Sequence, residues 1–452
     1  MTSRTSSYPK SNNLRRIGEK IVAETLRAAD PCRLVRDQVA VEGDRITVQG
    51  RAFPLSRGRR IHALGAGKAA PFLFEGLKEI LGDRICGGVI VSIPEHAFRD
   101  RRVTFAAGSH PVPDRRSVLA ARRVCTYIGR EVSADDLVFF LLGGGASSLF
   151  AMPLAPATLA DKGMLTRGLL RSGAAIGEIN CVRKHFSAVK GGRLAALIHP
   201  AETVTLILSD IIGSPLDQIG SGPTVADQST FRQAVSVLTK YGLIGRIRPG
   251  LREFIKEGLR KKRLETPKPG VQALSRSYPF LVGDNRLVLQ KAAESAESHG
   301  IRARILSADD EGEASETARV YGDVIKKHIL SRSAGTPPIL LLSGGELTVT
   351  IRGDGKGGRN QEFILALLAE LREIRHPFHI LSMGTDGVDG PTDAAGAWID
   401  ERSAARARKL GLDAADHLRR NDSYHFFRKM NQLIVTGPTR TNVMDLRMFL
   451  IG

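Results

Sequence analysis

Aromatic residues and cysteines are both scarce in this chain. Phe, Trp and Tyr make up 5% of the 452 residues, so an aromatic platform for stacking single-stranded nucleic acid is poorly supplied. The cysteines are Cys32, Cys86, Cys125 and Cys181, and no two of them form a C-x-x-C pair. This pattern indicates reduced thiols in a cytosolic protein and argues against a zinc site or a disulfide framework.

An apolar leader is also missing from the sequence as it stands. The first sixteen residues are polar and basic and contain no acidic residue, which favours a disordered start over a transit-like segment. Residues 137–160 carry no charge, but they contain three consecutive glycines, two serines and two prolines. A buried strand and loop therefore fits this segment better than a membrane span. We expect a cytoplasmic protein that does not bind a membrane.

Acidic residues are fewer than basic residues in this chain. The chain has 66 Lys and Arg against 47 Asp and Glu, a net charge of +19. Such a balance attracts phosphate, carboxylate or nucleic acid, but it also arises from an ordinary solvated surface. No zinc-finger spacing and no RNA-recognition signature accompanies the charge. We expect no specific nucleic acid partner, and nucleic-acid binding stays an alternative that the charge alone suggests.

Strand-like and helical segments alternate along the whole chain. A hydrophobic fraction of 42% and 47 glycines are typical of an α/β protein with many short loops. Strands are expected at residues 60–64, 88–93, 137–142, 204–208, 278–282, 303–306, 339–342 and 378–381, and helices at 14–29, 118–128, 157–175, 285–299, 315–329 and 363–371. This βαβ alternation predicts a parallel sheet with helices on both faces.

The length of the chain predicts two or three domains. A basic stretch from residue 231 to 271, rich in proline at its end, interrupts the alternation before the pattern restarts at residue 278. We place the junction within this stretch, which predicts an N-terminal domain at residues 1–245 and a C-terminal domain at residues 246–452.

Three apolar runs each lead to the same tripeptide, Gly-Pro-Thr, at residues 222–224, 390–392 and 437–439. An apolar run that stops at Gly, Ser, Thr and Asp is typical of a strand that gives way to a tight loop. In open α/β sheets, ligands bind outside the carboxyl ends of the strands. The repetition predicts a polar cleft for small anionic molecules, built from loops spread over the chain.

Residues 65–70, with the sequence GAGKAA, follow a strand and open a helix. They fit the G-x-G-x-x-A form of a dinucleotide fingerprint, but the acid expected about 20 residues further on is missing. Glu95 lies too far along, and the segment is not a Walker A loop because Lys68 precedes Ala69. Glycine amides at a helix start and a nearby Lys can still hold an anion. The alternative is a surface lysine on a tight turn.

Two further regions offer groups for an anion. Residues 143–148 (GGGASS) follow the most apolar strand, and their glycines allow close approach of a ligand while Ser147 and Ser148 offer hydroxyls. Residues 180–193 contain Arg183 and Lys190, and an arginine is suited to bidentate recognition of a carboxylate. A flexible loop and plain surface charge are the alternatives.

Residues 355–362 (GKGGRNQE) form another glycine-rich loop before a helix, with Arg359 at the helix start. Asp210, and Asp386 with Asp389 in residues 385–390 (TDGVDG), lie near strand ends. Phosphoryl transfer uses Mg²⁺, which takes one or two carboxylates together with phosphate oxygens. Each aspartate could equally be an Asx-turn residue.

These motifs together resemble the class II glycerate kinase (glycerate 2-kinase) family, some members of which are labelled hydroxypyruvate reductase. The matching stretches, in order over nearly the whole chain, are residues 65–70, 109–114, 182–185, 190–194, 208–210, 221–224, 357–362, 384–390, 421–424 and 436–439. Departures from the family pattern are Gly143, Ala146 and Arg440, which put details of substrate contact in doubt.

The resemblance implies an α/β fold with an N-terminal Rossmann-like domain, a smaller C-terminal α/β domain and an active site in the cleft between them. It implies ATP, Mg²⁺ and the phosphorylation of D-glycerate to 2-phosphoglycerate, and it leaves open whether the protein forms a homo-oligomer. An NAD(P)H-dependent hydroxypyruvate reductase is the main rival. From the motifs and the resemblance together, the expected catalytic residues are Lys68, Arg359 and Asp210, the expected substrate- or nucleotide-binding residues are Gly65, Gly67, Gly144, Gly145, Ser147, Ser148, Arg183, Lys190, Asn360 and Thr385, and the expected metal ligand is Asp386.

Overall fold

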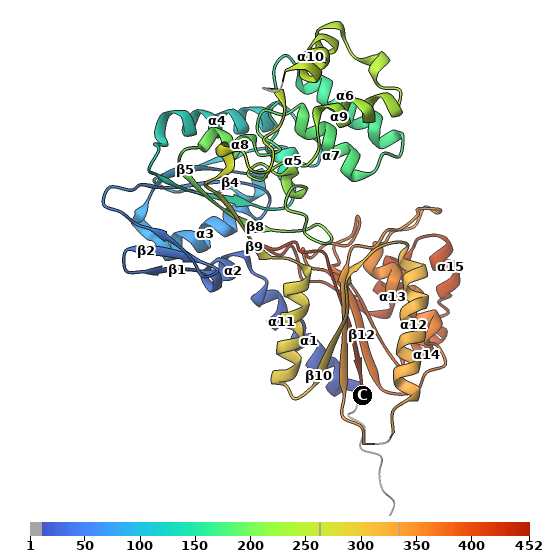
Figure 1. Ribbon diagram of the computed structural model, residues 1–452. Coiled ribbons are helices and arrows are strands. Elements are labelled where there is room, and N and C mark those ends of the chain that lie inside the picture. Colours follow the sequence, from blue (N-terminus) through green and yellow to red (C-terminus); the bar gives the residue numbers. More distant parts are fainter. Residues whose placement is uncertain (1–10, 262–263, 334) are drawn as a thin grey trace, which may run out of the picture. The chain divides into compact units, whose positions relative to one another are not determined.

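The computed structural model describes residues 11–261, 264–333 and 335–452, which form two α/β units (Figure 1). Unit 1 comprises Met1–Asp30 and Gly283–Gly452, and unit 2 comprises Pro31–Val282. The predicted junction between residues 245 and 246 differs from this division, because the chain leaves unit 2 only after β9 (Ser277–Gly283) has joined its sheet. Of the start expected to be disordered, residues 1–10 lie outside the described part and residues 11–16 open α1 (Ser11–Ala28).

Unit 2 is built on the predicted parallel sheet. Its strands lie in the order β6 (Val103–Ala107), β5 (Ile85–Ser92), β4 (Ile61–Ala66), β7 (Leu137–Leu142), β8 (Glu202–Leu208) and β9. The pairs from β6 to β8 are parallel. Every residue of β4 and β7 is buried, as expected for central strands covered on both faces. The carboxyl ends of β4 and β7 therefore meet at one edge of the sheet.

Two groups of helices complete unit 2. Those that pack on the sheet are α3 (Ala70–Leu81), α4 (Arg115–Glu131) and α8 (Arg193–Ile198), and those that share a separate apolar core are α6 (Leu159–Arg171), α7 (Ile176–His185), α9 (Phe231–Lys240) and α10 (Pro249–Arg260). Short elements that the periodicity did not predict are α2 (Pro31–Gln38), β1 (Val39–Glu42), β2 (Arg45–Val48), β3 (Arg51–Pro54), the edge strand β6 and α5 (Ala146–Leu149).

Unit 1 contains a mixed sheet rather than a second parallel one. Its strands lie in the order β10 (Arg302–Asp310), β11 (Ile339–Gly345), β15 (Asp445–Ile451), β12 (Phe378–Gly384), β13 (Gly396–Asp400) and β14 (Leu433–Ile434). The β10–β11 pair is parallel, and the other pairs are antiparallel. The restarted βαβ pattern holds only for β10 and β11, because the unpredicted strand β15 inserts between β11 and β12.

Helices cover both faces of the unit 1 sheet (Figure 1). On one face α1 and α11 (Asn285–Ser298) pack together, and on the other α12 (Ala314–Leu330) packs with α13 (Arg359–Glu370). The shorter helices are α14 (Ser403–Lys409), α15 (Ala414–Arg419) and α16 (Ser423–Met430). Within the described residues, no helix has the length and apolar character needed to cross a membrane.

Candidate active site

Two glycine loops cross where β4 and β7 end. The Gly143 amide donates to the backbone of β4, and the Lys68 amide donates to the Gly144 carbonyl at 2.8 Å. Gly67 has a φ of +134°, and a Cβ added to it would lie 2.5 Å from the Gly143 oxygen. A Cβ on Gly65 would lie 2.9 Å from a backbone oxygen of β7. The first glycines of the GAGKAA turn therefore allow the two loops to touch, and the Lys68 amide is used in that contact.

The crossing brings several side chains together around Gly144 and Gly145. A Cβ added to Gly145 would lie 3.5 Å from Cγ of Lys68 and 2.9 Å from Cδ2 of His110, and a Cβ on Gly144 would lie 2.1 Å from Oδ2 of Asp210. Burial, followed by the charge of Lys68, lowers the pKa of His110. Lys68 and Asp210, predicted from separate motifs, thus border the same short loop.

This loop retains donors for an anion. In residues 11–261, 264–333 and 335–452, no acceptor bonds the Lys68 ammonium or the amides of Gly144 and Gly145. A cation beside unused backbone amides is suited to phosphate or carboxylate oxygens.

A second cluster of cations lies in the helical part of unit 2. Lys190 is 1% exposed and donates to a backbone carbonyl at 3.0 Å. Lys162 donates to the carbonyls of Arg183 and Phe186 at 3.1 and 3.2 Å. Burial, followed by the charge of Arg183, lowers the pKa of Lys162 to about 7, and burial with both neighbouring cations lowers the pKa of Lys190 well below its usual value.

We call Lys162, Arg183 and Lys190 the cationic cluster. None of the three is ion-paired with a carboxylate of the described residues. Burying cations beside one another is costly unless a negative group compensates them. The cationic cluster is therefore suited to an anionic ligand. The sequence singled out Arg183 and Lys190, and it gave no sign of Lys162.

Hydroxyl groups link the glycine loop to this cluster. Ser147 Oγ lies 3.0 Å from Ser221 Oγ, which donates to Oδ1 of Asn180 on α7 at 3.3 Å. The carbonyl that accepts from Lys190 belongs to the residue before Ser221. Ser148 Oγ donates instead to a backbone carbonyl at 2.5 Å. Ser147 is thus connected to the cationic cluster, whereas the Ser148 hydroxyl has a local structural bond.

Two other basic residues of the 180–193 motif are paired with carboxylates inside unit 2. Lys184 Nζ lies 3.2 Å from Asp227, and His185 Nε2 lies 2.7 Å from Glu265. Burial alone would lower the pKa of His185, but hydrogen bonds to the Cys181 carbonyl and to Glu265 raise it to about 9. These pairs stabilise the fold around the cationic cluster.

In unit 1, the start of α13 holds Arg359. Its Nε lies 2.9 Å from Asp445 on β15, and its Nη1 lies 2.9 Å from Glu346. Asn360 and Arg447 also bond to Asp445, at 2.9 and 3.3 Å. Burial alone would lower the pKa of Arg359, but the Asp445 charge raises it. Arg359 is therefore a fixed cation, and 31% of its side chain is exposed.

Asp389 fixes the first turn of this helix. Its two carboxylate oxygens accept the amides of Asn360 and Gln361, at 3.0 and 2.9 Å. A Cβ on Gly358 would lie 2.3 Å from the Asp389 Cγ, so the glycine before Arg359 is needed for this close approach. Burial raises the pKa of Asp389 to about 6. Asp389 thus acts as a helix cap that positions Arg359.

Thr385 and Asp386 both have structural bonds at the end of β12. The buried Thr385 hydroxyl donates to the Met444 carbonyl at 2.7 Å and accepts from the Val443 amide at 2.9 Å. Oδ1 of Asp386 accepts from the Val388 amide at 3.1 Å, which is an Asx-turn bond. Their roles in ligand binding and metal binding stay predictions.

The threonines of the three Gly-Pro-Thr tripeptides also bond within their own units. Thr224 accepts from Thr205 at 2.8 Å, Thr392 donates to the Asp389 carbonyl at 2.8 Å, and Thr439 donates to the Thr385 carbonyl at 2.6 Å. These three hydroxyls therefore form hydrogen bonds that stabilise the loops in which they lie.

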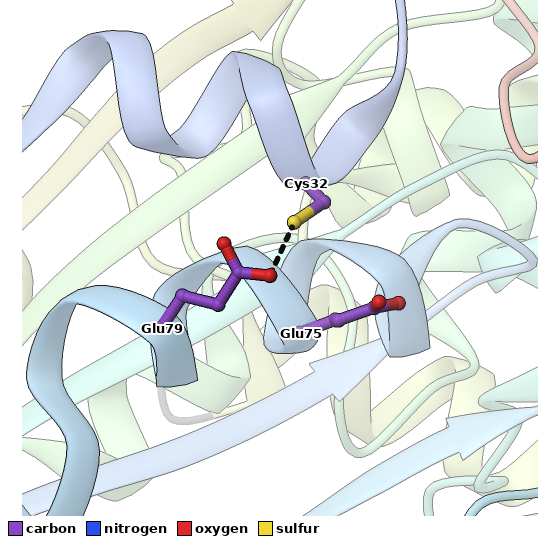
Figure 2. Close-up of side chains that lie close together, drawn as sticks. All are labelled: Cys32, Glu75 and Glu79. Atoms are coloured by element: carbon purple, nitrogen blue, oxygen red, sulfur yellow. Dashed lines mark hydrogen bonds between the residues drawn. The ribbon is translucent and has the colours of Figure 1, made fainter.

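One group of three potential metal ligands occurs among the described residues: Cys32 with Glu75 and Glu79. Figure 2 shows the Cys32 thiol facing Glu79, to which it donates at 3.5 Å. Burial, followed by the charge of Glu79, raises the pKa of Cys32 to about 11, which disfavours the thiolate that binds metal. This group does not fit a metal site, and neither Asp210 nor Asp386 belongs to it.

Each unit contains residues beside its predicted cations that were not predicted as site residues. In unit 2 they are His110, Lys162, Asn180 and Ser221, and in unit 1 they are Glu346 and Asp445. His110, Asn180 and Ser221 lie inside or beside motif stretches, so the motifs offered a signal for them. Lys162, Glu346 and Asp445 lie outside the motif stretches. Packing within unit 2 brings Lys162 to Arg183, and packing within unit 1 brings Glu346 and Asp445 to Arg359.

Comparison with known proteins identifies the family of this chain. A domain family of unknown function (DUF4147) matches residues 18–256, and the MOFRL family matches residues 339–445. A glycerate 2-kinase of Pyrococcus horikoshii is 36% identical over 435 residues, which cover 96% of each chain. This chain belongs to the glycerate 2-kinase family.

Other members of the glycerate 2-kinase family support the fold. The crystal structure of a glycerate kinase from Thermotoga maritima has a TM-score of 0.86 and 36% sequence identity, and the match covers 98% of this chain and 100% of that one. An Agrobacterium vitis protein named as a hydroxypyruvate reductase is 39% identical over 87% of this chain and 100% of its own. The expected two-domain α/β architecture is confirmed.

Proposed function

We propose that this protein transfers the terminal phosphoryl group of ATP to the 2-hydroxyl of D-glycerate in the cytoplasm. A bond forms between the substrate oxygen and the phosphorus, the bond to the ADP oxygen breaks, and the hydroxyl proton is released. The observation that carries this proposal is the set of anion-binding groups in unit 2, where Lys68 and the cationic cluster both lack carboxylate partners among the described residues.

The two sets of cations suit the two anionic ends of the reaction. Lys68 and the amides of Gly144 and Gly145 would hold phosphoryl oxygens, where preorganised donors stabilise charge that develops in the transition state. Arg183 and the two lysines of the cationic cluster would hold the carboxylate of D-glycerate, with the Arg183 fork giving a bidentate contact. Arg359 belongs to unit 1, and we propose that its guanidinium also stabilises charge on the transferred phosphoryl group. The variant Arg359→Lys tests this role separately.

Asp210 fits the requirement for a magnesium ligand. Its carboxylate borders the Lys68 loop, and Mg²⁺ needs only one or two protein carboxylates when phosphate oxygens and waters complete its shell. Mg²⁺ held there would neutralise charge on the ATP phosphates. Asp386 remains a second proposed ligand. The variants Asp210→Asn and Asp386→Asn distinguish them, because only loss of a true ligand raises the Mg²⁺ concentration needed for half-maximal activity.

A hydroxypyruvate reductase is the second candidate, because some relatives carry that name. The dinucleotide fold needs an acid at the end of the second strand to bind the ribose. Here β5 ends at Ser92, and Glu95 follows in a separate turn with its side chain exposed. This arrangement favours the kinase.

A paired assay decides between the two activities. Purified protein with ATP, Mg²⁺ and D-glycerate is expected to release ADP, and the same protein with NADH or NADPH and hydroxypyruvate is expected to leave the cofactor unoxidised. Cofactor oxidation as fast as ADP release would refute the kinase. Omission of D-glycerate controls for ATP hydrolysis.

A further inference from the structure

Asn180 carries a side-chain amide that the fold leaves half used. The residue lies within α7 and is 4% exposed. Its Oδ1 accepts from Ser221 Oγ at 3.3 Å, whereas its Nδ2 donates to no acceptor in the part of the chain that the structure describes. Nδ2 is not among the polar atoms sealed inside the core. Because asparagine is a poor residue for a helix interior, its presence there calls for another reason, and a small molecule can reach its free donor.

The neighbours of this amide place it beside the cationic cluster. Asn180 and Arg183 lie three residues apart on α7, so they share one face of the helix. The Gly220 carbonyl accepts from Lys190 at 3.0 Å, and the next residue, Ser221, donates to the Asn180 oxygen. Since the oxygen and nitrogen of a carboxamide are bonded to the same carbon, Nδ2 lies near these groups as well.

A hydroxyl adds a second uncharged group at this place. Ser147 Oγ lies 3.0 Å from Ser221 Oγ, and it has no other partner among residues 11–261, 264–333 and 335–452. A serine hydroxyl can both donate and accept a hydrogen bond. Ser147 and Asn180 are therefore joined through one buried hydroxyl and keep unused hydrogen-bonding capacity. Unlike Lys68 and the cationic cluster, neither of them is charged.

We propose that Asn180 is a specificity-determining residue, whose Nδ2 donates a hydrogen bond to the 3-hydroxyl of D-glycerate, with Ser147 as the second partner of that hydroxyl. This inference rests on the proposed function, in which the cationic cluster holds the carboxylate and Lys68 holds the phosphoryl group. The 3-hydroxyl is the polar group of the substrate that remains, and it is uncharged. A 2-hydroxy acid without it would leave buried polar groups unpaired, which disfavours its binding.

D-Lactate tests this role, because it differs from D-glycerate only by lacking the 3-hydroxyl. Dissociation constants of both acids are measured by isothermal titration calorimetry. The wild-type protein is expected to bind D-glycerate about tenfold more tightly, the effect of one hydrogen bond. Asn180→Ala should weaken D-glycerate by about the same factor and change D-lactate by less than about twofold. Equal weakening of both acids, which a merely structural role would cause, would overturn the proposal, and so would no change in either.

A second variant and a control complete the experiment. Asn180→Asp keeps an oxygen that can accept from Ser221 and loses the donor, so its added charge should weaken both acids while the preference for D-glycerate still disappears. Gly177→Ala, at an exposed position of α7 with open space for a methyl group, should keep the wild-type preference. Failure of the wild type to release ADP with D-glycerate would refute the proposed function itself. An active wild type whose preference survives in both Asn180 variants would refute only the role of Asn180.

Discussion

Lys162 occupies an environment that disfavours its charge. It is 9% exposed, and its pKa is lowered to about 7 by burial and by Arg183. The ammonium donates to carbonyls at the end of α7, where the helix dipole favours a positive group. Lys162 therefore gains or loses its charge within the physiological pH range, and the positive potential of the cationic cluster changes with it.

The KM for D-glycerate should consequently depend on pH. Lys162 is protonated below its pKa of about 7 and neutral above it, so the attraction for a carboxylate falls as the pH rises through 7. We expect KM to rise roughly fivefold, equivalent to about 1 kcal/mol of lost interaction. Steady-state kinetics of wild type and Lys162→Met test this. The variant should have a high KM at every pH, whereas Arg167→Met, at an exposed position of α6, should follow the wild type. A parallel rise in Lys162→Met would contradict the assignment.

Lys68 should contribute mainly to kcat. Removing one preorganised charge contact to a transition state commonly costs about 10² to 10³ in rate, so Lys68→Ala is expected to lose that much activity while its circular dichroism is unchanged. Lys78→Ala serves as the control, because the Lys78 side chain is 54% exposed and pairs with Asp100 rather than with the loop that borders Lys68. Full turnover by folded Lys68→Ala protein would remove Lys68 from the reaction.

At the scale of elements, α13 and β15 act together. The Arg359 side chain begins α13 and is held by Asp445 of β15, which is fully buried. Arg359→Lys keeps the positive charge but loses the planar guanidinium, which pairs with both Asp445 and Glu346. We expect kcat to fall by about tenfold or more with a smaller change in the KM for D-glycerate. Arg372→Lys, at an exposed position beyond α13, should have no effect. An unchanged kcat in Arg359→Lys would exclude its role.

The same strand shows where sequence patterns fail. The run from Asp445 to Ile451 was not predicted as a strand, because two charged residues break its apolar character. Both are buried, and they are compensated by Arg359 and Asp310, which lie far away in the chain. The strand Leu137–Leu142 was predicted with its observed bounds. A strand that is buried on both faces consists of consecutive apolar residues, which are easy to find in a sequence.

The sequence carries a local signal for some residues of the two groups described above and none for others. Glycine-rich turns carry a local signal, so Lys68 and residues 143–145 could be found from sequence. The neighbours of Lys162 and Asp445 are distant in sequence and are brought to them by tertiary packing. A single charged residue outside a motif does not indicate such contacts. The Gly67 amide illustrates a further limit, because its motif predicted an anion contact whereas it donates to Val91 at 3.1 Å.

At the scale of the whole molecule, the first helix belongs to the unit formed by the end of the chain. Ile21 is fully buried in the core shared by α1, α11 and the unit 1 sheet, and Lys20 beside it is exposed. Ile21→Asp is expected to destabilise unit 1 by several kcal/mol, the cost of an unpaired buried charge, and Lys20→Asp by less than about 0.5 kcal/mol.

Limited proteolysis followed by mass spectrometry distinguishes the two units. Ile21→Asp should accelerate cleavage within residues 283–452 while residues 31–282 stay protected, because the latter have their own cores. Equal acceleration in both units, or faster cleavage confined to residues 31–282, would contradict the division.

The position of the new phosphate tests the central proposal most directly. After incubation of the wild-type protein with ATP, Mg²⁺ and D-glycerate, the product is examined by proton-coupled ³¹P NMR. A phosphate on the 2-oxygen couples to the single proton at carbon 2 and gives a doublet, which is the predicted result. A triplet from two carbon-3 protons, or only inorganic phosphate from ATP, would contradict the account.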